Sequence, residues 1–201
     1  MKTQGLVPAL PSVQPDEVFE AYGSHGTCMS RAISIRDNGF KLSPGGRRGS
    51  GAYFWFAASP RCPYAQSLAV GWYNSPSRHN LFSKEPDPSG AIVWGKISAP
   101  SKEVLNLESP FFRDTLRKAL EPSWSTISRK PRREIERFVS RIHEKLISDI
   151  NAVMPVSIVL ATVQPPPVDD PLKIYVGQPF ALIIRKLSCL QIDSEIEGIP
   201  K

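Results

Sequence analysis

The chain contains few cysteines and few histidines. Its three cysteines, Cys28, Cys62 and Cys189, are odd in number and widely scattered among 201 residues. This set does not resemble the disulfide framework of a small secreted domain, so we expect a reducing, cytoplasmic environment. The three histidines and three cysteines also lack the ligand spacing of a zinc site. We therefore predict that no metal is bound.

Long apolar runs are absent as well. No stretch approaches the length of about 18 apolar residues that a membrane-spanning helix needs, and we expect no membrane association. Residues 1–15 lack the apolar core of a signal peptide and are predicted to form a flexible, proline-containing tail. Hydrophobic residues make up 41% of the chain and charged residues 22%, which is typical of a globular protein. The length suits a single domain, residues 1–201, with a sizeable core.

Hydrophobic periodicity predicts an α+β fold with a mixed, mostly antiparallel sheet. The expected strands cover residues 51–58, 91–98, 156–163 and 180–185, with further strand segments at 104–107, where the edge of 91–98 continues, and at 187–192. The expected helices cover residues 28–38, 64–73 and 111–121, and a longer one carries the apolar stripe Ile135, Phe138, Val139, Ile142, Leu146 and Ile150. A short helical turn is expected at 16–22 and a polar tail at 193–201.

Positive charge is concentrated in one part of the chain. The formal net charge is +6, and residues 111–145 hold ten Lys or Arg residues against five acidic ones, so this segment carries +5 of the +6. The expected helix there places Arg133, Arg137, Arg141 and Lys145 four residues apart, along one side. Such a row suits an acidic macromolecule, although an ordinary solvated helix face would look the same.

The most informative part of the chain runs from His25 to Tyr64. His25-Gly26-Thr27 precedes an expected helix that ends at Asn38-Gly39-Phe40. A glycine-rich stretch then leads into Gly49-Ser50-Gly51-Ala52-Tyr53-Phe54, and Tyr64 follows Tyr53 by 11 residues. Each piece alone says little. Their order and spacing resemble the ADP-ribosyltransferases of the poly(ADP-ribose) polymerase (diphtheria-toxin-like) type.

The resemblance covers roughly residues 20–100 and 155–192. Residues 90–97 look like the family's next core strand, and residues 180–190 look like its final strand pair. The resemblance therefore implies an ADP-ribosyltransferase-like core, built on a split, mostly antiparallel sheet with peripheral helices. Residues 108–152 are interpreted as a helical insertion into that core.

The same resemblance implies that NAD⁺ is the substrate and gives several residues a role. Tyr53 and Tyr64 would enclose the nicotinamide ring, and Gly26 would offer its backbone N–H and C=O to the carboxamide. His25, with Thr27 beside it, would hydrogen-bond the adenosine ribose. His25 and Tyr53 are thus the expected catalytic residues.

Elementary chemistry agrees with these residue types. An aromatic ring stacked on the flat nicotinamide contributes on the order of 1 kcal/mol, and a glycine allows close backbone approach. Cleavage of the nicotinamide–ribose bond passes through an oxocarbenium-like transition state, so positioning and electrostatics supply most of the catalysis. Arg47 and Arg48 on the glycine-rich stretch would meet the pyrophosphate; the alternative is simple solvent exposure.

One departure from the family limits the expected product. Polymerising members carry a glutamate at the start of the last core strand, where this chain has Ala181, and no carboxylate lies between Asp170 and Asp193. We therefore predict a mono-ADP-ribosyltransferase. The alternatives are a catalytically inactive module of the same fold that binds NAD⁺ or nucleic acid, and an unrelated basic RNA-binding domain.

The basic row gives a prediction for the partner. We expect Arg133, Arg137, Arg141 and Lys145 to bind a macromolecular acceptor, nucleic acid in preference to protein, or an acidic inhibitory partner such as an antitoxin. A compact catalytic domain with a basic insertion is similar to bacterial toxins or effectors of this family.

Overall fold

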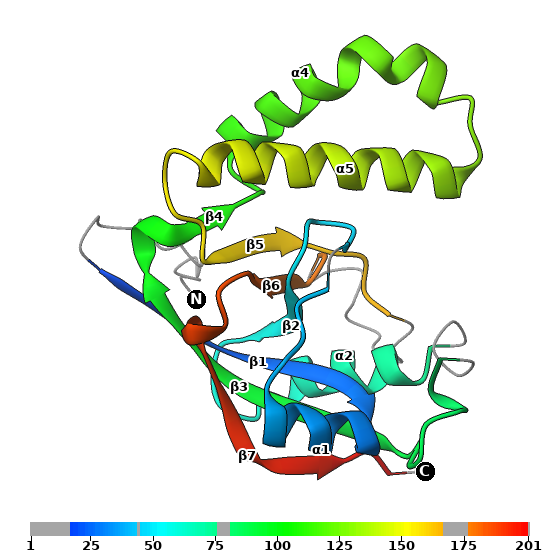
Figure 1. Cartoon of the computed structure of the whole chain (residues 1–201), viewed down its shortest axis with the longest axis vertical. Helices are drawn as coiled ribbons and strands as arrows, with labels where there is room; N and C mark the ends of the chain where they lie inside the picture. Colours follow the sequence, from blue (N-terminus) through cyan, green and yellow to red (C-terminus); the bar gives the residue numbers. More distant parts are fainter. Residues whose placement is uncertain (1–16, 44, 76–80, 167–176, 201) are drawn as a thin grey trace, which may run out of the picture.

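Seven strands form one sheet in the order β4-β5-β6-β2-β1-β3-β7 (Figure 1). The computed structural model describes residues 17–43, 45–75, 81–166 and 177–200. All neighbouring strands are antiparallel except β4 and β5, which are parallel. The strands are β1 (Val18–Cys28), β2 (Ala52–Ala57), β3 (Gly90–Pro100), β4 (Val104–Asn106), β5 (Ile158–Thr162), β6 (Phe180–Ile184) and β7 (Leu190–Gly198). The predicted α+β fold class is confirmed.

Helices cover both faces of this sheet. Within the described residues they are α1 (Met29–Asn38), α2 (Pro63–Tyr73), α4 (Pro110–Ile127) and α5 (Arg132–Asn151), with short 3-10 turns η1 (Ser101–Glu103) and η2 (Leu187–Cys189). Gly39 ends α1 at a φ of 77°, a left-handed conformation that glycine adopts readily. No described helix is long and apolar enough to cross a membrane.

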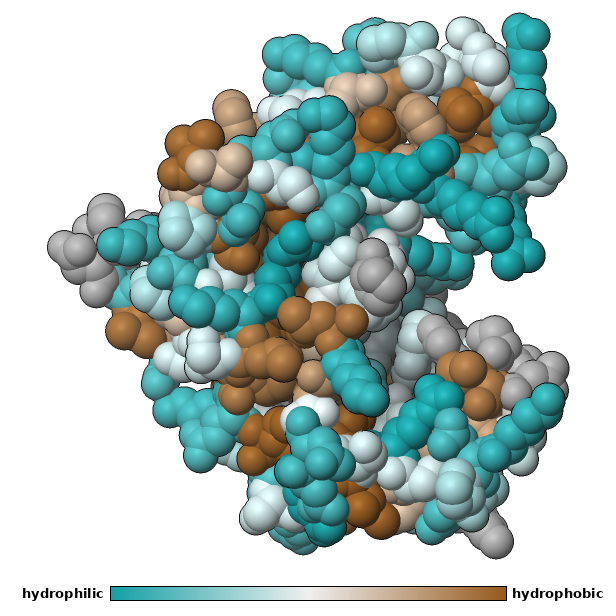
Figure 2. Space-filling model, viewed as in Figure 1, coloured by the Kyte–Doolittle hydropathy of each residue, from teal (hydrophilic) through white to brown (hydrophobic). Residues whose placement is uncertain are grey.

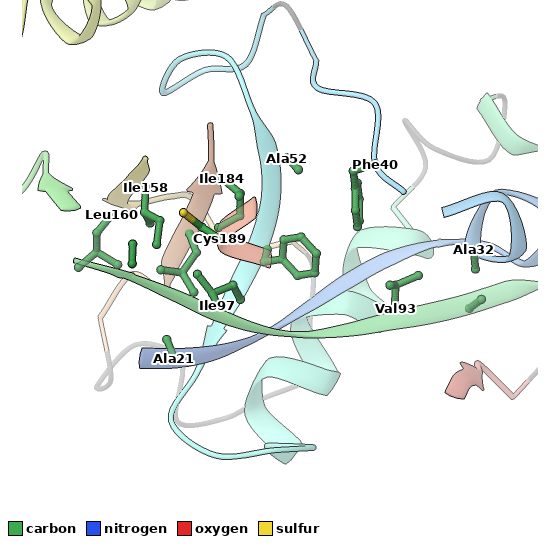
Figure 3. Packing of buried hydrophobic residues seen from close by; sticks show 14 residues of the cluster. Ala21, Ala32, Phe40, Ala52, Val93, Ile97, Ile158, Leu160, Ile184 and Cys189 are labelled. Carbon is green, nitrogen blue, oxygen red and sulfur yellow. The ribbon is translucent and has the colours of Figure 1, made fainter. Parts of the chain in front are cut away.

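One face of the sheet packs against α1. Side chains alternate along β2, so Phe54 points to this face and joins Val93 and Ile97 of β3. Figure 3 shows this cluster, with Ala32 of α1 and Phe40 on the same side of the sheet. Burial of these apolar side chains fixes the order of the central strands.

The opposite face is shared by α2 and by the α4–α5 hairpin. Trp55 of β2 packs with Ala65 and Leu68 of α2. Farther along the same face, Ile183 of β6 lies beneath Ile147 of α5. The hairpin lies over β5 and β6 at one end of the molecule, as Figure 1 shows.

Several sequence predictions differ from the structure. Residues 18–22 belong to β1 rather than to a helical turn, because their alternating side chains fit a strand that is half buried. Residues 104–106 pair with β5 at the far edge of the sheet and do not extend the edge of β3. Residues 193–198 continue β7, so they are not a loose tail. The expected N-terminal tail, residues 1–15, lies outside the described residues.

The other predictions of secondary structure agree with the structure over most of their length. The four expected main strands and the helices expected at 28–38 and 64–73 are present within a few residues of their predicted bounds, whereas the helix expected at 111–121 continues to Ile127. Residues 110–127 and 132–151, within the segment expected to be helical, form the α4–α5 hairpin. Ser109 begins it by accepting a hydrogen bond from the Phe112 N–H at 3.2 Å, which is a typical helix cap.

Candidate functional site

A fork between two central strands brings the predicted motifs together. β1 pairs with β3 along its whole length, from Val18 opposite Pro100 to Cys28 opposite Gly90. Its pairing with β2 ends at Ser24, which lies opposite Trp55. Residues 25–28 therefore extend past the recorded pairing with β2. The His25-Gly26-Thr27 motif lies on one arm of this fork, and Tyr53 lies on the other.

His25 connects the two arms of the fork. Its Nδ1 lies 2.8 Å from the carbonyl oxygen of Tyr53. Because a carbonyl oxygen only accepts, Nδ1 donates this hydrogen bond and carries a proton. The imidazole contacts Phe40 edge-on, with ring centroids 5.1 Å apart, and lies 5.7 Å from Phe54. The ring orientation is therefore fixed by both polar and aromatic contacts.

Gly26 faces α2, on the other side of the sheet from His25. A Cβ atom at this position would lie 2.1 Å from the carbonyl oxygen of Ala69, so only glycine allows α2 to pack this closely. Nearby, the Ser24 hydroxyl donates to the carbonyl oxygen of Ala65 at 2.7 Å. Thr27 is buried, with 3% of its surface exposed. The structure thus gives Gly26 a packing role alongside the predicted ligand role.

Tyr53 is enclosed by the glycine-rich segment, which we define as residues 45–51. Its hydroxyl donates to the carbonyl oxygen of Gly49 at 2.7 Å and accepts from the backbone N–H of Arg48 at 3.1 Å. A Cβ atom at Gly46 would lie 2.1 Å from this hydroxyl. Burial raises the pKa of the Tyr53 phenol, so the hydroxyl is protonated and able to donate.

Tyr64 and Tyr53 lie on the same side of the sheet. Tyr64 is in the first turn of α2 and is 36% exposed, whereas Tyr53 points from β2 toward the α4–α5 hairpin. Trp55 projects from β2 on this side too, two residues beyond Tyr53. It is buried and meets Trp72 edge-on, with ring centroids 6.3 Å apart.

Trp55, which the sequence analysis did not single out, lies on the same face of β2 as Tyr53. The signal was available, because alternation along a strand places residues 53 and 55 on one face. Ala181 lies directly opposite Trp55 on β6 and is 3% exposed. Ala181 is therefore a buried, apolar position directly across the strand pair from Trp55.

Two side chains from distant elements form hydrogen bonds with the backbone of the glycine-rich segment. Glu144 of α5 accepts from the backbone N–H of Ser50 at 2.6 Å and receives two hydrogen bonds from Arg185, at 2.8 and 3.0 Å. Burial alone would raise the pKa of the Glu144 carboxyl, but the hydrogen bonds from Arg185 and Ser50 outweigh it, and this pKa lies below its usual range. Neither Glu144 nor Arg185 was predicted, since nothing in the sequence relates residue 144 to residue 50.

The two arginines of the segment have different surroundings. Arg48 is partly buried under the hairpin, where Nε donates to the Thr162 carbonyl oxygen and Nη1 donates to Nε2 of His143, each at 3.3 Å. Arg47 is paired with Glu136 of α5 at 3.1 Å, yet its side chain stays 65% exposed. Of the two, Arg47 has the more accessible guanidinium.

His143 is a buried histidine beneath the hairpin. It is 1% exposed, its Nδ1 donates to the Val139 carbonyl oxygen at 3.0 Å, and its ring stacks on Phe112 with centroids 6.1 Å apart. Burial lowers the pKa of His143, and the charge of Arg48 lowers it further. A neutral ring is also what accepting a hydrogen bond from Arg48 requires.

The basic row on α5 is exposed along its whole length. Arg133, Arg137, Arg141 and Lys145 all face solvent, as the spacing predicts, and Lys145 is paired with Asp149 at 2.7 Å. Figure 2 shows a hollow between the α4–α5 hairpin and the lower part of the molecule, with hydrophilic surface along the hairpin side.

A second concavity lies elsewhere, on the β1–β3–β7 side of the sheet. Its volume is about 420 Å³, and Tyr22, Trp94, Arg61 and Lys96 are among its lining residues. Arg61 lies over the Trp94 ring and is paired with Asp193, Glu195 and Glu197 of β7. This concavity contains no predicted site residue.

Neither metals nor known relatives help to identify the site. Among the described residues, no group of three or more His, Cys, Asp or Glu side chains has an arrangement that would hold a metal ion. Comparison of the chain with protein-family models and with curated proteins found no match.

Proposed function

We propose that the chain binds NAD⁺ at the fork between β1 and β2 and transfers single ADP-ribose units to a macromolecular acceptor. The observation that carries this proposal is the 2.8 Å hydrogen bond from His25 to the Tyr53 carbonyl. This bond joins the His25-Gly26-Thr27 motif to the strand that carries Tyr53, and the order of these two motifs resembles that of ADP-ribosyltransferases. A chance likeness of sequence gives no reason for these motifs to meet in space.

In the proposed complex, the ligand occupies the fork. Tyr53 and Tyr64, both on the α2 side of the sheet, flank the nicotinamide, and Gly26 offers its backbone to the carboxamide. His25, with Thr27 next to it, hydrogen-bonds a ribose hydroxyl of the ligand. Arg47 is better placed than Arg48 to meet the pyrophosphate, because the Arg48 guanidinium is engaged beneath α5.

The reaction needs no redox partner. The bond between ribose C1′ and the nicotinamide nitrogen breaks, and its electron pair leaves with neutral nicotinamide. A nucleophile of the acceptor attacks C1′ and loses its proton. The enzyme contributes by holding the oxocarbenium-like transition state in place, through His25 and the backbone of the fork.

The surroundings of Ala181 support single transfer. Because residue 181 is an alanine, this position holds no acid that could activate a growing chain. A carboxylate there would be buried next to Trp55, which is unfavourable. The acceptor itself must then supply or stabilise the attacking group.

The basic row on α5 indicates the acceptor. Arg133, Arg137 and Arg141 are exposed on α5, and guanidinium groups suit a phosphate backbone. The hairpin that contains α5 borders the hollow seen in Figure 2. We therefore favour nucleic acid over protein as the acceptor, and an acidic antitoxin-like protein as an inhibitor that binds the same surface. A toxin or effector that acts in the cytoplasm would fit both.

The decisive experiment is an NAD⁺ consumption assay with and without RNA, DNA and protein acceptors, run beside direct NAD⁺ titration. We expect nicotinamide release together with a labelled acceptor. NAD⁺ binding without consumption would support the inactive module instead. Nucleic-acid binding with no NAD⁺ binding would identify a basic RNA-binding domain and refute the proposal.

A further inference from the structure

We infer that Glu144 and Arg185 are positioning residues that hold the glycine-rich segment over Tyr53, so that the NAD⁺ site is complete only when α5 is docked. The inference rests on the proposed function for its link to NAD⁺. Its structural part, control of the segment by the α4–α5 hairpin, is testable separately.

The geometry around Ser50 carries the inference. Glu144 accepts the Ser50 backbone N–H at 2.6 Å, and Arg185 donates to the Ser50 backbone carbonyl at 3.2 Å. The same two side chains bind each other twice, at 2.8 and 3.0 Å. Both backbone groups of one loop residue are thus held by side chains from α5 and from the end of β6. We call this arrangement the Ser50 clamp.

The segment needs such support because of its glycines. Gly49 has a φ of 107° and Gly51 a φ of 148°, conformations that other residues rarely adopt. Glycine also loses the most conformational entropy when its backbone is fixed. Contacts from outside the segment must therefore offset the cost of ordering it. Ile147 adds one, because a Cβ atom at Gly49 would lie 2.8 Å from its Cδ1 atom.

The clamp connects directly to Tyr53. Arg48 and Gly49, which bind the Tyr53 hydroxyl, immediately precede Ser50. Releasing Ser50 frees the backbone that fixes this ring. The chain of contacts therefore runs from α5 through three consecutive loop residues to a predicted nicotinamide contact.

The Glu144–Arg185 ion pair is also partly shielded from solvent, which strengthens its hold on the segment. The side chains of Arg185 and Glu144 are 18% and 33% exposed, and both of the Glu144 oxygens accept charge-assisted hydrogen bonds. More exposed ion pairs on the same helix, such as Lys145 with Asp149, contribute little by comparison. This contrast supplies a matched control.

The experiment combines native-state trypsin digestion with NAD⁺ titration. Trypsin cuts after Arg47 and Arg48 when the segment opens. We expect Glu144→Ala to speed cleavage there about tenfold or more, since cleavage follows the population of the open form. Asp149→Ala, which breaks an exposed ion pair on the same helix, should leave the rate unchanged. Glu144→Gln serves as a milder variant if Glu144→Ala folds poorly, and melting curves check the fold of each.

The functional readouts distinguish positioning from general stability. Glu144→Ala should raise the KM for NAD⁺ about tenfold with a much smaller change in kcat, because a loosened segment weakens binding. Exchanging the charges, Glu144→Arg with Arg185→Glu, should restore part of the protection from trypsin.

The outcomes test the clamp, its link to the ligand and the proposed function separately. Cleavage in Glu144→Ala as slow as in Asp149→Ala overturns the clamp, whether or not the parent consumes NAD⁺. Fast cleavage with an unchanged KM overturns the link between clamp and ligand. Absence of NAD⁺ binding by the parent refutes the proposed function itself, independently of the trypsin result.

Discussion

The side chain of His25 and the backbone of Tyr53 are joined by a 2.8 Å hydrogen bond across the fork where β1 and β2 separate. The bond uses Nδ1 of the ring, so a substitution that keeps Nδ1 but loses Nε2 separates folding from ligand binding. Asparagine is such a substitution, because its amide nitrogen superimposes closely on Nδ1.

We expect His25→Asn to retain the melting temperature of the parent within a few degrees and to lose NAD⁺ binding and transfer. His25→Ala loses the hydrogen bond and the contacts with Phe40 and Phe54, and it should cost about 1–2 kcal/mol of stability besides. Thermal melts and NAD⁺ titration measure the two effects. An active His25→Asn protein would show that Nε2 has no role.

Tyr64 tests the nicotinamide contact without disturbing the core, since its ring is 36% exposed. Tyr64→Ala should weaken NAD⁺ affinity by about 1 kcal/mol, the contribution of one aromatic stack. Tyr64→Phe keeps the ring and should bind like the parent. Isothermal titration distinguishes them, and equal affinity in both variants would remove Tyr64 from the site.

The strands show which parts of the fold could be predicted from the sequence alone. Local patterns were enough to place β2, β3, β5 and β6, because each is a short apolar run bounded by turns. They also predicted the amphipathic α5 from its apolar stripe. The strand at 104–106 was expected in the right residues but at the wrong edge, since its partner β5 is more than 50 residues away in the chain.

In the candidate site, too, features set by local sequence were predicted and features set by distant contacts were not. His25, Gly26 and Tyr53 were predicted as site residues from motif order, and the structure brings His25 and Tyr53 into contact. The Ser50 clamp depends on the way the α4–α5 hairpin folds back over the sheet. No local pattern contains that information, because Glu144 on an amphipathic helix looks like any other surface carboxylate.

Ala181 is the position that tests single transfer. Ala181→Glu buries a carboxylate beside Trp55, and we expect it to lower stability by about 2 kcal/mol or more without producing polymer. Trp55→Ala combined with Ala181→Glu makes room for the acid and should hydrolyse NAD⁺ faster than Trp55→Ala alone. Denaturing gels of labelled acceptor show the product size, and a ladder from the parent protein would contradict single transfer.

His143 predicts a loss of stability in mild acid. Burial holds its folded-state pKa below the unfolded value, so protons bind preferentially to the unfolded chain once the pH falls below that unfolded pKa, about 6.5. Between pH 7 and 5 the parent should lose stability that His143→Gln does not lose. The lowered pKa of Glu144 acts at lower pH, below its unfolded value of about 4.5, where its protonation weakens the Ser50 clamp. Urea denaturation at a series of pH values measures both losses, and parallel curves for parent and variant above pH 5 would argue against a neutral buried His143.

The basic row predicts a dependence on salt. Replacing Arg133, Arg137, Arg141 and Lys145 with glutamine should reduce the log–log salt slope of single-stranded RNA or DNA binding by about two to three units, at about 0.7 per phosphate contact. Lys145 should contribute least, because Asp149 already pairs with it. NAD⁺ affinity should not change. Unaltered acceptor modification at every salt concentration would show that the row is only a solvated face.

The two edge strands of the sheet, β4 and β7, affect how readily the molecule aggregates at high concentration. At one edge, β4 is three residues long; at the other, β7 carries Asp193, Glu195 and Glu197, which all reach Arg61. A short edge strand and an edge lined with carboxylates both disfavour strand addition by a neighbouring molecule. Fibril formation and sheet-to-sheet self-association are thereby opposed at both ends. Neutralising the three carboxylates as amides should therefore expose an edge prone to aggregation, even where the fold itself survives.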